Sequence, residues 1–308
     1  GGGGKGMREV SKPQDLPEAL RAAKSEAQSS FGDDSVYMEK RIVRPRHVEV
    51  QILADSHGNV IHLFERDCSL QRRHQKVVEE APCPIIRPEV REAMTTVAIN
   101  AAKAVAYEGA GTVEFLLGED QSFYFLEMNT RLQVEHPITE QITGVDLVCE
   151  QLRVAMGEPL SIKQEDLRIL GHAMEFRIYA EDAWNGWAPS PGPLSVYSAP
   201  EGPWVRIDSG VAEQDQVTIY YDPMIAKLVV WGRNREEVIH RSKQVLSEFQ
   251  IGGITTTIPF FMSVLQDADF VSSNIDTGYI TPEKLEALKP VESLDEQAVL
   301  AHVAAAIF

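Results

Sequence analysis

Two glutamates, Glu114 and Glu127, each interrupt an apolar stretch of the sequence, GTVEFLL and FYFLEMN. The turn-forming run at 118–121 lies between them, so we expect a hairpin that brings the carboxylates opposite each other. Buried like charges repel unless a cation lies between them, and oxygen ligands of this kind suit Mg²⁺. The alternative is a pair of carboxylates on a solvated strand face. Apolar neighbours argue against it: Phe115, Leu116, Phe125 and Leu126.

Polar residues recur at every second position from the second of these glutamates onward: Glu127, Asn129, Arg131, Gln133 and Glu135. An extended chain has a period of two, so we expect these side chains to project from one face. A solvated edge strand would give the same alternation and remains the alternative. An arginine, an amide and an acid beside a metal site could hold an anion and leave one base next to it.

Basic residues gather locally in QRRHQK at 71–76, although the chain as a whole carries a formal net charge of −17. This acidity opposes general binding to nucleic acid or to anionic membranes. A nucleic-acid or localisation patch is the alternative for 71–76, but no aromatic residues are interleaved there. Arginine, histidine and lysine in one loop suit phosphate or bicarbonate better.

The opening run GGGGKGM at 1–7 could be a linker or a phosphate-binding loop. Glycines let backbone N–H groups approach phosphate closely. The run is not a Walker A loop, because no GK[ST] follows it.

Bulk properties are those of a soluble globular protein: 308 residues, 44% hydrophobic and 24% charged. The cysteines, Cys68, Cys83 and Cys149, are scattered and predict neither a disulfide framework nor a zinc site, so we expect the cytosol or an organelle matrix. No apolar run reaches the roughly 18 residues that span a bilayer. Both ends of the sequence look like cuts.

Periodicity predicts helices at 17–30, 88–107, 146–156 and 235–249, and strands at 36–40 and 224–231. It also predicts two hairpins, 47–54 with 60–64 and 111–117 with 122–128. From about residue 170 the composition changes to short β-rich runs separated by prolines, which indicates a domain boundary there. The pattern is that of an α+β protein.

Taken together, these residues resemble the ATP-grasp family, and biotin carboxylase within it. The matching strings run in order along the chain: GGGGKGM, MEK, PRHVEVQ, ERDCSLQRRHQKVVEEAP, GAGTVEF, EMNTRLQVEHPITE, GHAMEFRIYAED and YYDPMIAKL. Carbamoyl-phosphate synthetase shares the two-carboxylate hairpin, whereas NTRLQVEHP and GHAMEFRIYAED point to biotin carboxylase.

The resemblance implies an ATP-grasp fold, with a partial lid subdomain and a core antiparallel sheet with helices, followed by a biotin carboxylase C-terminal α/β domain. It divides the chain into a lid remnant (1–41), the ATP-grasp core (42–170), the C-terminal domain (171–285) and a tail or linker (286–308). The family's N-terminal domain and the start of the lid have no counterpart here. We therefore expect exposed strand edges and little or no ATP turnover by this chain alone.

The resemblance also implies an ATP-dependent ligase that makes carboxyphosphate from ATP and bicarbonate and then carboxylates biotin on a carrier. A pair of Mg²⁺ or Mn²⁺ ions would be held by Glu114, Glu127 and Asn129. Nucleotide contacts would come from Gly3, Gly4, Glu39, Lys40, Ile42, His47, Gln71, His74, Leu116 and Ile275. Bicarbonate would be held by Lys76, Arg131, Gln133, Val134 and Glu135.

Four positions are implied to be catalytic. Glu135 would be the general base for bicarbonate, while Lys76 and Arg131 would steady the anion. Arg177 would stabilise the biotin enolate. The implied partners are a biotin carboxyl carrier, a carboxyltransferase component and a second copy of the intact chain, without nucleic acid or membrane. The implied compartment is the cytoplasm, or the mitochondrial matrix in a eukaryote.

Two other functions stay open. The chain could belong to another ATP-grasp ligase acting on a different carboxylate or amine, which would cleave ATP without responding to biotin. It could also be a carboxylase-like assembly domain without turnover. Loss of Glu135, Lys76 or Arg177 would mark that last class, and all three are present.

Overall fold

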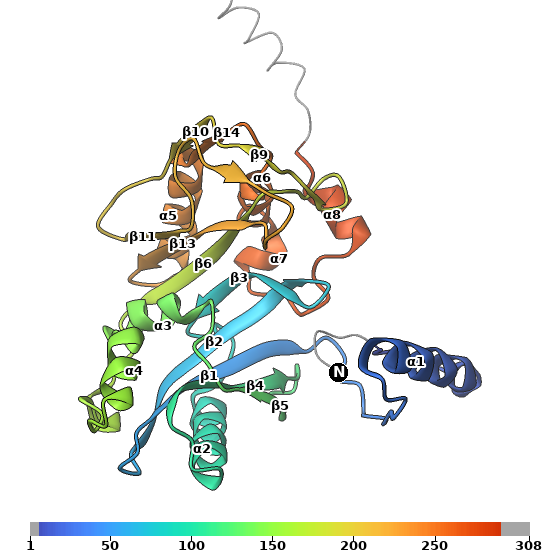
Figure 1. Cartoon of the computed structure of the whole chain (residues 1–308), viewed down its shortest axis with the longest axis vertical. Coiled ribbons are helices and arrows are strands. Elements are labelled where there is room, and N and C mark those ends of the chain that lie inside the picture. Colours follow the sequence, from blue (N-terminus) through green and yellow to red (C-terminus); the bar gives the residue numbers. More distant parts are fainter. Residues whose placement is uncertain (1–5, 291–308) are drawn as a thin grey trace, which may run out of the picture. The chain divides into compact units, whose positions relative to one another are not determined.

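The computed structural model describes residues 6–290 (Figure 1). The chain forms two compact units, which are described separately. Among the described residues, the first comprises 6–139, 145–167 and 276–279, and the second comprises 140–144, 168–275 and 280–290. Within the described residues, no helix is both long enough and apolar enough to cross a membrane.

The sheet of the first unit is antiparallel, with strand order β3-β2-β1-β4-β5. Its strands are β1 (Arg46–Ala54), β2 (Val60–Arg72), β3 (Gln75–Ala81), β4 (Gly109–Leu117) and β5 (Phe123–Asn129). Its helices are α1 (Leu16–Phe31), α2 (Pro88–Ala104) and α4 (Leu147–Ala155), with short 3₁₀ turns at Pro13–Asp15 and Gln164–Asp166. Helix α3 (His136–Thr143) runs from the first unit into the second.

The two faces of this sheet have opposite chemistry because successive side chains of a strand point to opposite sides. Apolar residues of β1 and β4, such as Val48, Val50 and Val113, pack with Met94 and Ala98 of α2. Helix α2 packs mainly on β1 and β2, and Figure 1 shows it lying along this side of the sheet. The alternate positions carry polar residues that are nevertheless buried: Glu49, Gln51, Thr112 and Glu114. This buried polar face is where the candidate site lies.

The second unit contains an antiparallel sheet segment in which β13 (Met224–Gly232) lies between β11 (Val205–Ser209) and β6 (His172–Tyr179). Helices α5 (Arg235–Glu248) and α6 (Ile258–Val264) cover its apolar face, where the rings of Phe176 and Phe261 lie 5.4 Å apart. The remaining elements are β7 (Glu181–Asp182), β8 (Ala188–Pro189), β9 (Gly192–Pro193), β10 (Val196–Ser198), β12 (Gln216–Val217), β14 (Gln250–Gly252), α7 (Ala268–Val271) and α8 (Pro282–Leu288). Helix α8 runs across the boundary expected at 285/286.

The α+β class is as predicted from the sequence, and both predicted hairpins and all four predicted long helices are present, although the ends of α2 and β2 differ. Asp146 caps α4 by accepting a hydrogen bond from the backbone N–H of Cys149, and Gly157 beyond the end of α4 has φ +82°.

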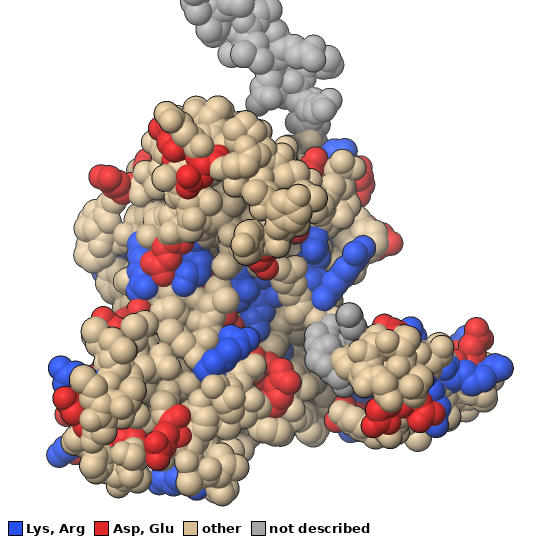
Figure 2. Space-filling view, viewed as in Figure 1, with Lys and Arg blue, Asp and Glu red and all other residues tan. Residues whose placement is uncertain are grey.

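On the face drawn in Figure 2, acidic and basic side chains are interspersed over α1 rather than separated by sign.

Three predictions about local structure are wrong. Residues 36–40 form no strand, because no neighbouring strand within the described residues supplies backbone hydrogen bonds to them. Strand β2 does not stop at Phe64 but continues to Arg72, past a left-handed residue (Phe64, φ +64°) and two register shifts that hide its period-two pattern. Helix α2 ends at Ala104 rather than at 107, before Ala106 with φ +48°.

The basic cluster at 71–76 is also not a loop. Gln71 and Lys76 pair across the ends of β2 and β3, and only Arg73 and His74 form the turn. Both turn residues have positive φ, 49° and 68°, which is the twist that a two-residue hairpin turn requires. The short turn therefore holds Lys76 on a rigid strand.

Candidate active site

Lys76 is the centre of a cluster of buried carboxylates on the polar face of the first sheet. Its ammonium nitrogen lies 2.5 Å from Oε2 of Glu49, 2.6 Å from Oε1 of Glu135 and 3.1 Å from Oε1 of Glu114. The Lys76 side chain is only 12% exposed, and the three carboxylate side chains are 5% exposed or less. Burial disfavours the ammonium, but the surrounding carboxylates outweigh it and raise the pKa of Lys76 well above its ordinary value.

Two of these carboxylates are held in the ionised form. Burial favours the neutral acid in both, yet the charges of Lys76 and Arg66 lower the pKa of Glu49 to about 2. Likewise His47 and Lys76 outweigh burial and lower the pKa of Glu114 to about 2. The site thus keeps negative charge next to one ammonium.

Arg66 lies behind this cluster and is fully buried. Its guanidinium donates to Oε1 of Glu49 (2.6 Å) and Oε1 of Gln51 (2.7 Å). It also donates to the hydroxyls of Thr139 (2.9 Å) and Thr112 (3.2 Å). These four acceptors lie on β1, β4 and the first turn of α3, and they fix the guanidinium of Arg66 on β2 and, through it, Glu49.

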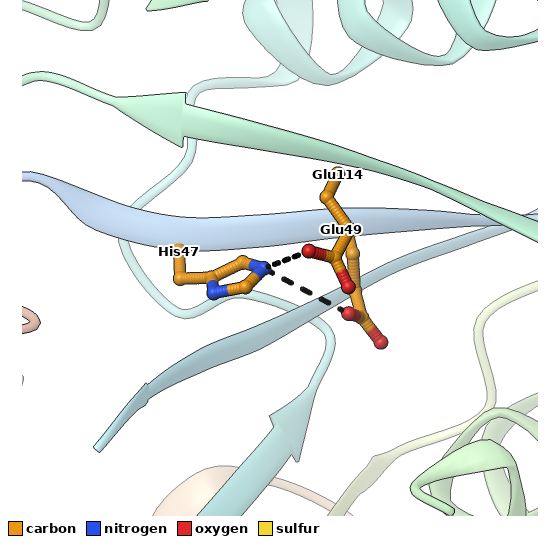
Figure 3. Close-up of side chains that lie close together, drawn as sticks. All are labelled: His47, Glu49 and Glu114. Atoms are coloured by element: carbon orange, nitrogen blue, oxygen red, sulfur yellow. Dashed lines mark ion pairs between the residues drawn. The ribbon is translucent and has the colours of Figure 1, made fainter. Parts of the chain in front are cut away.

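His47 lies beside the carboxylates, as Figure 3 shows. Its Nε2 is 3.0 Å from Oε2 of Glu114 and 4.0 Å from Oε2 of Glu49, without a well-aligned hydrogen bond to either. On the other side of the ring, the amide nitrogen of Gln71 lies 2.7 Å from Nδ1 and also donates to the carbonyl of Cys68. Since an amide N–H donates to Nδ1, the ring proton is on Nε2 and faces the carboxylates.

The expected pair, Glu114 and Glu127, does meet in register across the β4–β5 hairpin. The same row continues to Glu49 on β1, so three glutamates from neighbouring strands project from one face. Asn129 donates to Oε1 of Glu114 at 2.9 Å. Glu127 itself is exposed, however, and so are Phe125 (58%) and Leu126 (45%).

The expectation that apolar neighbours bury Glu127 is therefore wrong. Among the strands that the structure describes, β5 is last in the order, so only β4 pairs with it and its other edge is uncovered. Glu114 lies one strand further in and is buried. One carboxylate of the pair is enclosed and the other is open to solvent.

The polar row from Glu127 to Glu135 is only partly an extended chain. Strand β5 ends at Asn129, and a turn at Val134 and Glu135 leads into α3. Arg131 is exposed, and its guanidinium donates to Oε1 of the buried Gln133 at 3.1 Å. Glu135 is completely buried and contacts Lys76. The turn, rather than strand geometry, directs Glu135 to the cluster.

The other implied nucleotide residues are dispersed among the described elements. Leu116 is opposite His47 in the β1–β4 register. Glu39 and Lys40 are exposed in a segment without regular structure, and Ile42 next to it is half-buried. His74 is exposed at the β2–β3 turn. Ile275 is buried and directly precedes Asp276, whose carboxylate binds Arg44 in the first unit. Gly3 and Gly4 lie outside the described residues.

Arg177 lies on β6 in the second unit and is 9% exposed. Its directly opposite neighbour on β13 is Lys227.

Two residues of the cluster, Glu49 and Arg66, were not among the candidates from sequence. Glu49 occurs in VEVQ, where one acidic residue in an alternating strand reads as a solvated position. A signal that could have identified Glu49 is that the neighbouring strands β2 and β4 carry charged residues, Arg66 and Glu114, at the positions paired with it.

Family models match both parts of the chain. Residues 1–163 match the "Carbamoyl-phosphate synthase L chain, ATP binding domain", and residues 175–282 match the "Biotin carboxylase C-terminal domain". The chain belongs to the biotin carboxylase family. The ATP-grasp fold expected from the sequence is thereby confirmed.

Curated biotin carboxylases are similar along nearly the whole chain. Biotin carboxylase 1, chloroplastic, of Populus trichocarpa is 51% identical over 290 residues, which are 94% of this chain and 55% of the relative. The biotin carboxylase of a Nostoc species is 51% identical over 280 residues, which are 91% of this chain and 63% of the relative. The chain thus spans less than two thirds of the length of these relatives.

Solved biotin carboxylase structures have the same fold. The biotin carboxylase–β-γ-ATP complex from Campylobacter jejuni matches with TM-score 0.87 and 48% identity, over 91% of this chain and 62% of that one. A second match is the biotin carboxylase domain dimer of Hydrogenobacter thermophilus 2-oxoglutarate carboxylase, in complex with MgADP, ADP and bicarbonate. Its TM-score is 0.89 and its identity 43%, over 95% of this chain and 64% of that chain.

Proposed function

We propose that this chain carries the bicarbonate-activating site of a biotin carboxylase, which uses ATP to carboxylate biotin on a carrier by way of carboxyphosphate. The observation that carries the proposal is the contact of Lys76 with Glu135 at 2.6 Å inside a cluster of ionised carboxylates. A buried lysine next to a buried glutamate provides one cation for an anionic substrate and one base for its proton.

In the proposed reaction, Lys76 and Arg131 bind bicarbonate, with Gln133 and the backbone of Val134 orienting it. Glu135 accepts the bicarbonate hydroxyl proton while the oxygen attacks the γ-phosphorus of ATP and the bond to ADP breaks. The product is carboxyphosphate, which breaks down to phosphate and CO₂, and the CO₂ is added to N1′ of biotin. Arg177 is assigned to the biotin enolate that forms as phosphate removes the N1′ proton.

Mg²⁺ or Mn²⁺ is assigned to Glu114, Glu127 and Asn129. The donor set fits such an ion: Glu114 is ionised, Glu127 lies opposite it in register, and the Asn129 amide lies within 2.9 Å of Glu114. When bound, the ions would offset charge on the nucleotide phosphates. The open position of Glu127 leaves room for water or phosphate as further ligands.

Nucleotide contacts are assigned to Gly3, Gly4, Glu39, Lys40, Ile42, His47, Gln71, His74, Leu116 and Ile275. The Nε2 proton of His47 supports this, because it faces the cluster without a well-aligned acceptor. We assign 1–41 to a lid remnant, 42–170 to the ATP-grasp core, 171–285 to the C-terminal domain and 286–308 to a tail or linker.

The proposed partners are a biotin carboxyl carrier, a carboxyltransferase component and a second copy of the intact chain. Relatives named as one component of a larger carboxylase support the first two, such as the mitochondrial alpha subunit of methylcrotonoyl-CoA carboxylase of Rattus norvegicus. The proposed compartment is the cytoplasm, or the mitochondrial matrix in a eukaryote, and the mitochondrial name of the Rattus norvegicus relative supports the latter.

The test is ATP cleavage by the complete enzyme with and without bicarbonate and biotin. The proposal predicts that phosphate release depends on bicarbonate, that biotin accelerates it, and that labelled bicarbonate appears in carboxybiotin. ATP cleavage that ignores both compounds would favour another ATP-grasp ligase. Absence of cleavage despite nucleotide binding would favour an assembly domain. The 308-residue chain alone is expected to turn over little ATP.

A further inference from the structure

Arg44 joins segments of the first unit that are far apart in the sequence. Its Nε lies 2.9 Å from Oδ2 of Asp276, and its Nη1 lies 3.2 Å from Oε1 of Glu119. Asp276 belongs to the short segment 276–279 of the first unit, and Glu119 lies in the turn between β4 and β5. One side chain just before β1 therefore contacts a hairpin turn and a segment 232 positions further along the chain.

Backbone contacts reinforce this junction. The N–H of Thr277 donates to the carbonyl of Pro45 at 3.0 Å, next to Arg44. Oδ1 of Asp276 accepts from the N–H of Gly278 at 2.7 Å, which leaves Oδ2 for the guanidinium. Arg44 itself has φ 46°, a left-handed conformation that persists in an arginine only where the surroundings impose it. Tertiary contacts, rather than local preference, thus set the geometry here.

Each joined segment also carries or adjoins residues assigned to the nucleotide. They are Ile42 and His47 around the start of β1, Leu116 before the hairpin turn, and Ile275 before the segment 276–279. Ile275 is buried and is bonded directly to Asp276. A binding site is only as well preorganised as the chain segments that carry its residues. Contacts among these segments should therefore affect the affinity for the nucleotide.

Solvent exposure limits the size of this effect. The side chain of Arg44 is 48% exposed, that of Asp276 is 17% exposed and that of Glu119 is 65% exposed. Solvated ion pairs contribute little, so the pair with the more enclosed Asp276 is expected to matter most. Loss of this pair should change nucleotide affinity several-fold and leave the fold intact.

We propose that Arg44 and Asp276 are positioning residues for the nucleotide, which hold the segment that follows Ile275 against the start of β1. The inference rests on the proposed function, since the nucleotide assignments are taken from it. Both residues act through the segments that they join, and neither is assigned a contact with the reacting atoms.

The test compares wild type, Arg44→Asn, Asp276→Asn and the double variant in the complete enzyme. Asparagine tolerates a left-handed backbone, so Arg44→Asn removes the charge without adding strain. Each single variant is expected to raise the KM for ATP about fivefold, with kcat and the KM for bicarbonate within about twofold of wild type. Since both changes remove the same ion pair, the double variant should be no worse than either single one.

Two further variants serve as controls. Arg153→Asn is matched in exposure, because Arg153 is 49% exposed and pairs with Glu150 in the first unit, and it should keep the wild-type KM for ATP. Arg44→Lys retains the charge and is expected to stay within about twofold of wild type. Isothermal titration with ADP gives a readout independent of turnover, in which Arg44→Asn should weaken binding by a similar factor.

Two outcomes would overturn the inference. One is an Arg44→Asn enzyme with wild-type KM for ATP and wild-type affinity for ADP. The other is a double variant in which the two single effects multiply, as they would for residues that act independently. If the wild-type enzyme binds ADP but does not respond to biotin, the proposed function fails, and the titration still decides the role of Arg44.

Discussion

The Nζ atom of Lys76 lies 2.6 Å from Oε1 of Glu135, on the buried polar face of the first sheet. The two residues come from different local structures. Lys76 is held on β3 by a two-residue turn, and Glu135 is held by the turn that leads into α3. The alternation of polar and apolar residues along a strand therefore does not predict that Lys76 and Glu135 meet. Their contact joins the proposed anion-binding cation to the proposed base.

Replacing Lys76 with methionine tests the cation. We expect bicarbonate-dependent ATP cleavage by the complete enzyme to fall by about 100-fold or more, because Glu49, Glu114 and Glu135 lose their common counter-charge. Nucleotide binding, measured by isothermal titration, should fall much less. Lys103→Met, an exposed lysine in α2, is the matched control and should keep wild-type rates. Equal losses in both variants would contradict the assignment.

Replacing Arg66 with methionine tests the support behind the cluster. Removing one partner of a buried ion pair leaves Glu49 with a buried charge that is only partly compensated. We expect the free energy of unfolding to fall by about 3–5 kcal/mol. The measurement is equilibrium denaturation of the 308-residue chain. Arg87→Met serves as the control, because Arg87 is exposed and its pair with Glu89 is solvated, so a change within about 0.5 kcal/mol is expected. A loss below about 1 kcal/mol for Arg66→Met would show that Arg66 does not carry this role.

His62 predicts a pH dependence of stability. Burial lowers the pKa of His62 to about 4, below the ordinary value of about 6.5. Between about pH 4 and pH 6.5, the His62 ring is therefore protonated to a greater extent in the unfolded chain than in the folded chain. Stability contributed by the neutral ring is present above about pH 6.5 and is lost as the pH falls toward 4.

His62→Gln removes this titration, so its stability should fall less between pH 7 and 4 than that of wild type, by about 2 kcal/mol. Denaturant unfolding at a series of pH values gives the comparison. Parallel curves for the two proteins would contradict the low pKa of His62.

Much of the fold could be predicted from local pattern, and the exceptions have physical causes. The hairpin of β4 and β5 follows from its turn residues, and the α4 cap from Asp146. The C-terminal end of β2 was missed, because a left-handed residue at Phe64 and register shifts beyond it break the alternation.

A site residue could be predicted from the sequence only where its neighbours along the chain already show that its polar side chain is buried. Glu114 stands out because acids are rare inside apolar strands. Glu49 does not, since its burial arises from pairing with β2 and β4, which lie far away in the sequence. Conversely, Glu127 looked buried beside Phe125 and Leu126, but within residues 6–290 its strand has a neighbouring strand on one side only. Strand order, which periodicity does not encode, decides these cases.

The central claim is that Glu135 takes the bicarbonate proton, and Glu135→Gln in the complete enzyme tests it most directly. Glutamine keeps the size of the side chain but cannot act as the base. The account predicts that carboxylation of biotin by labelled bicarbonate is lost while ATP still binds with near wild-type affinity. Retained carboxylation at a comparable rate would contradict it and remove Glu135 from the base role.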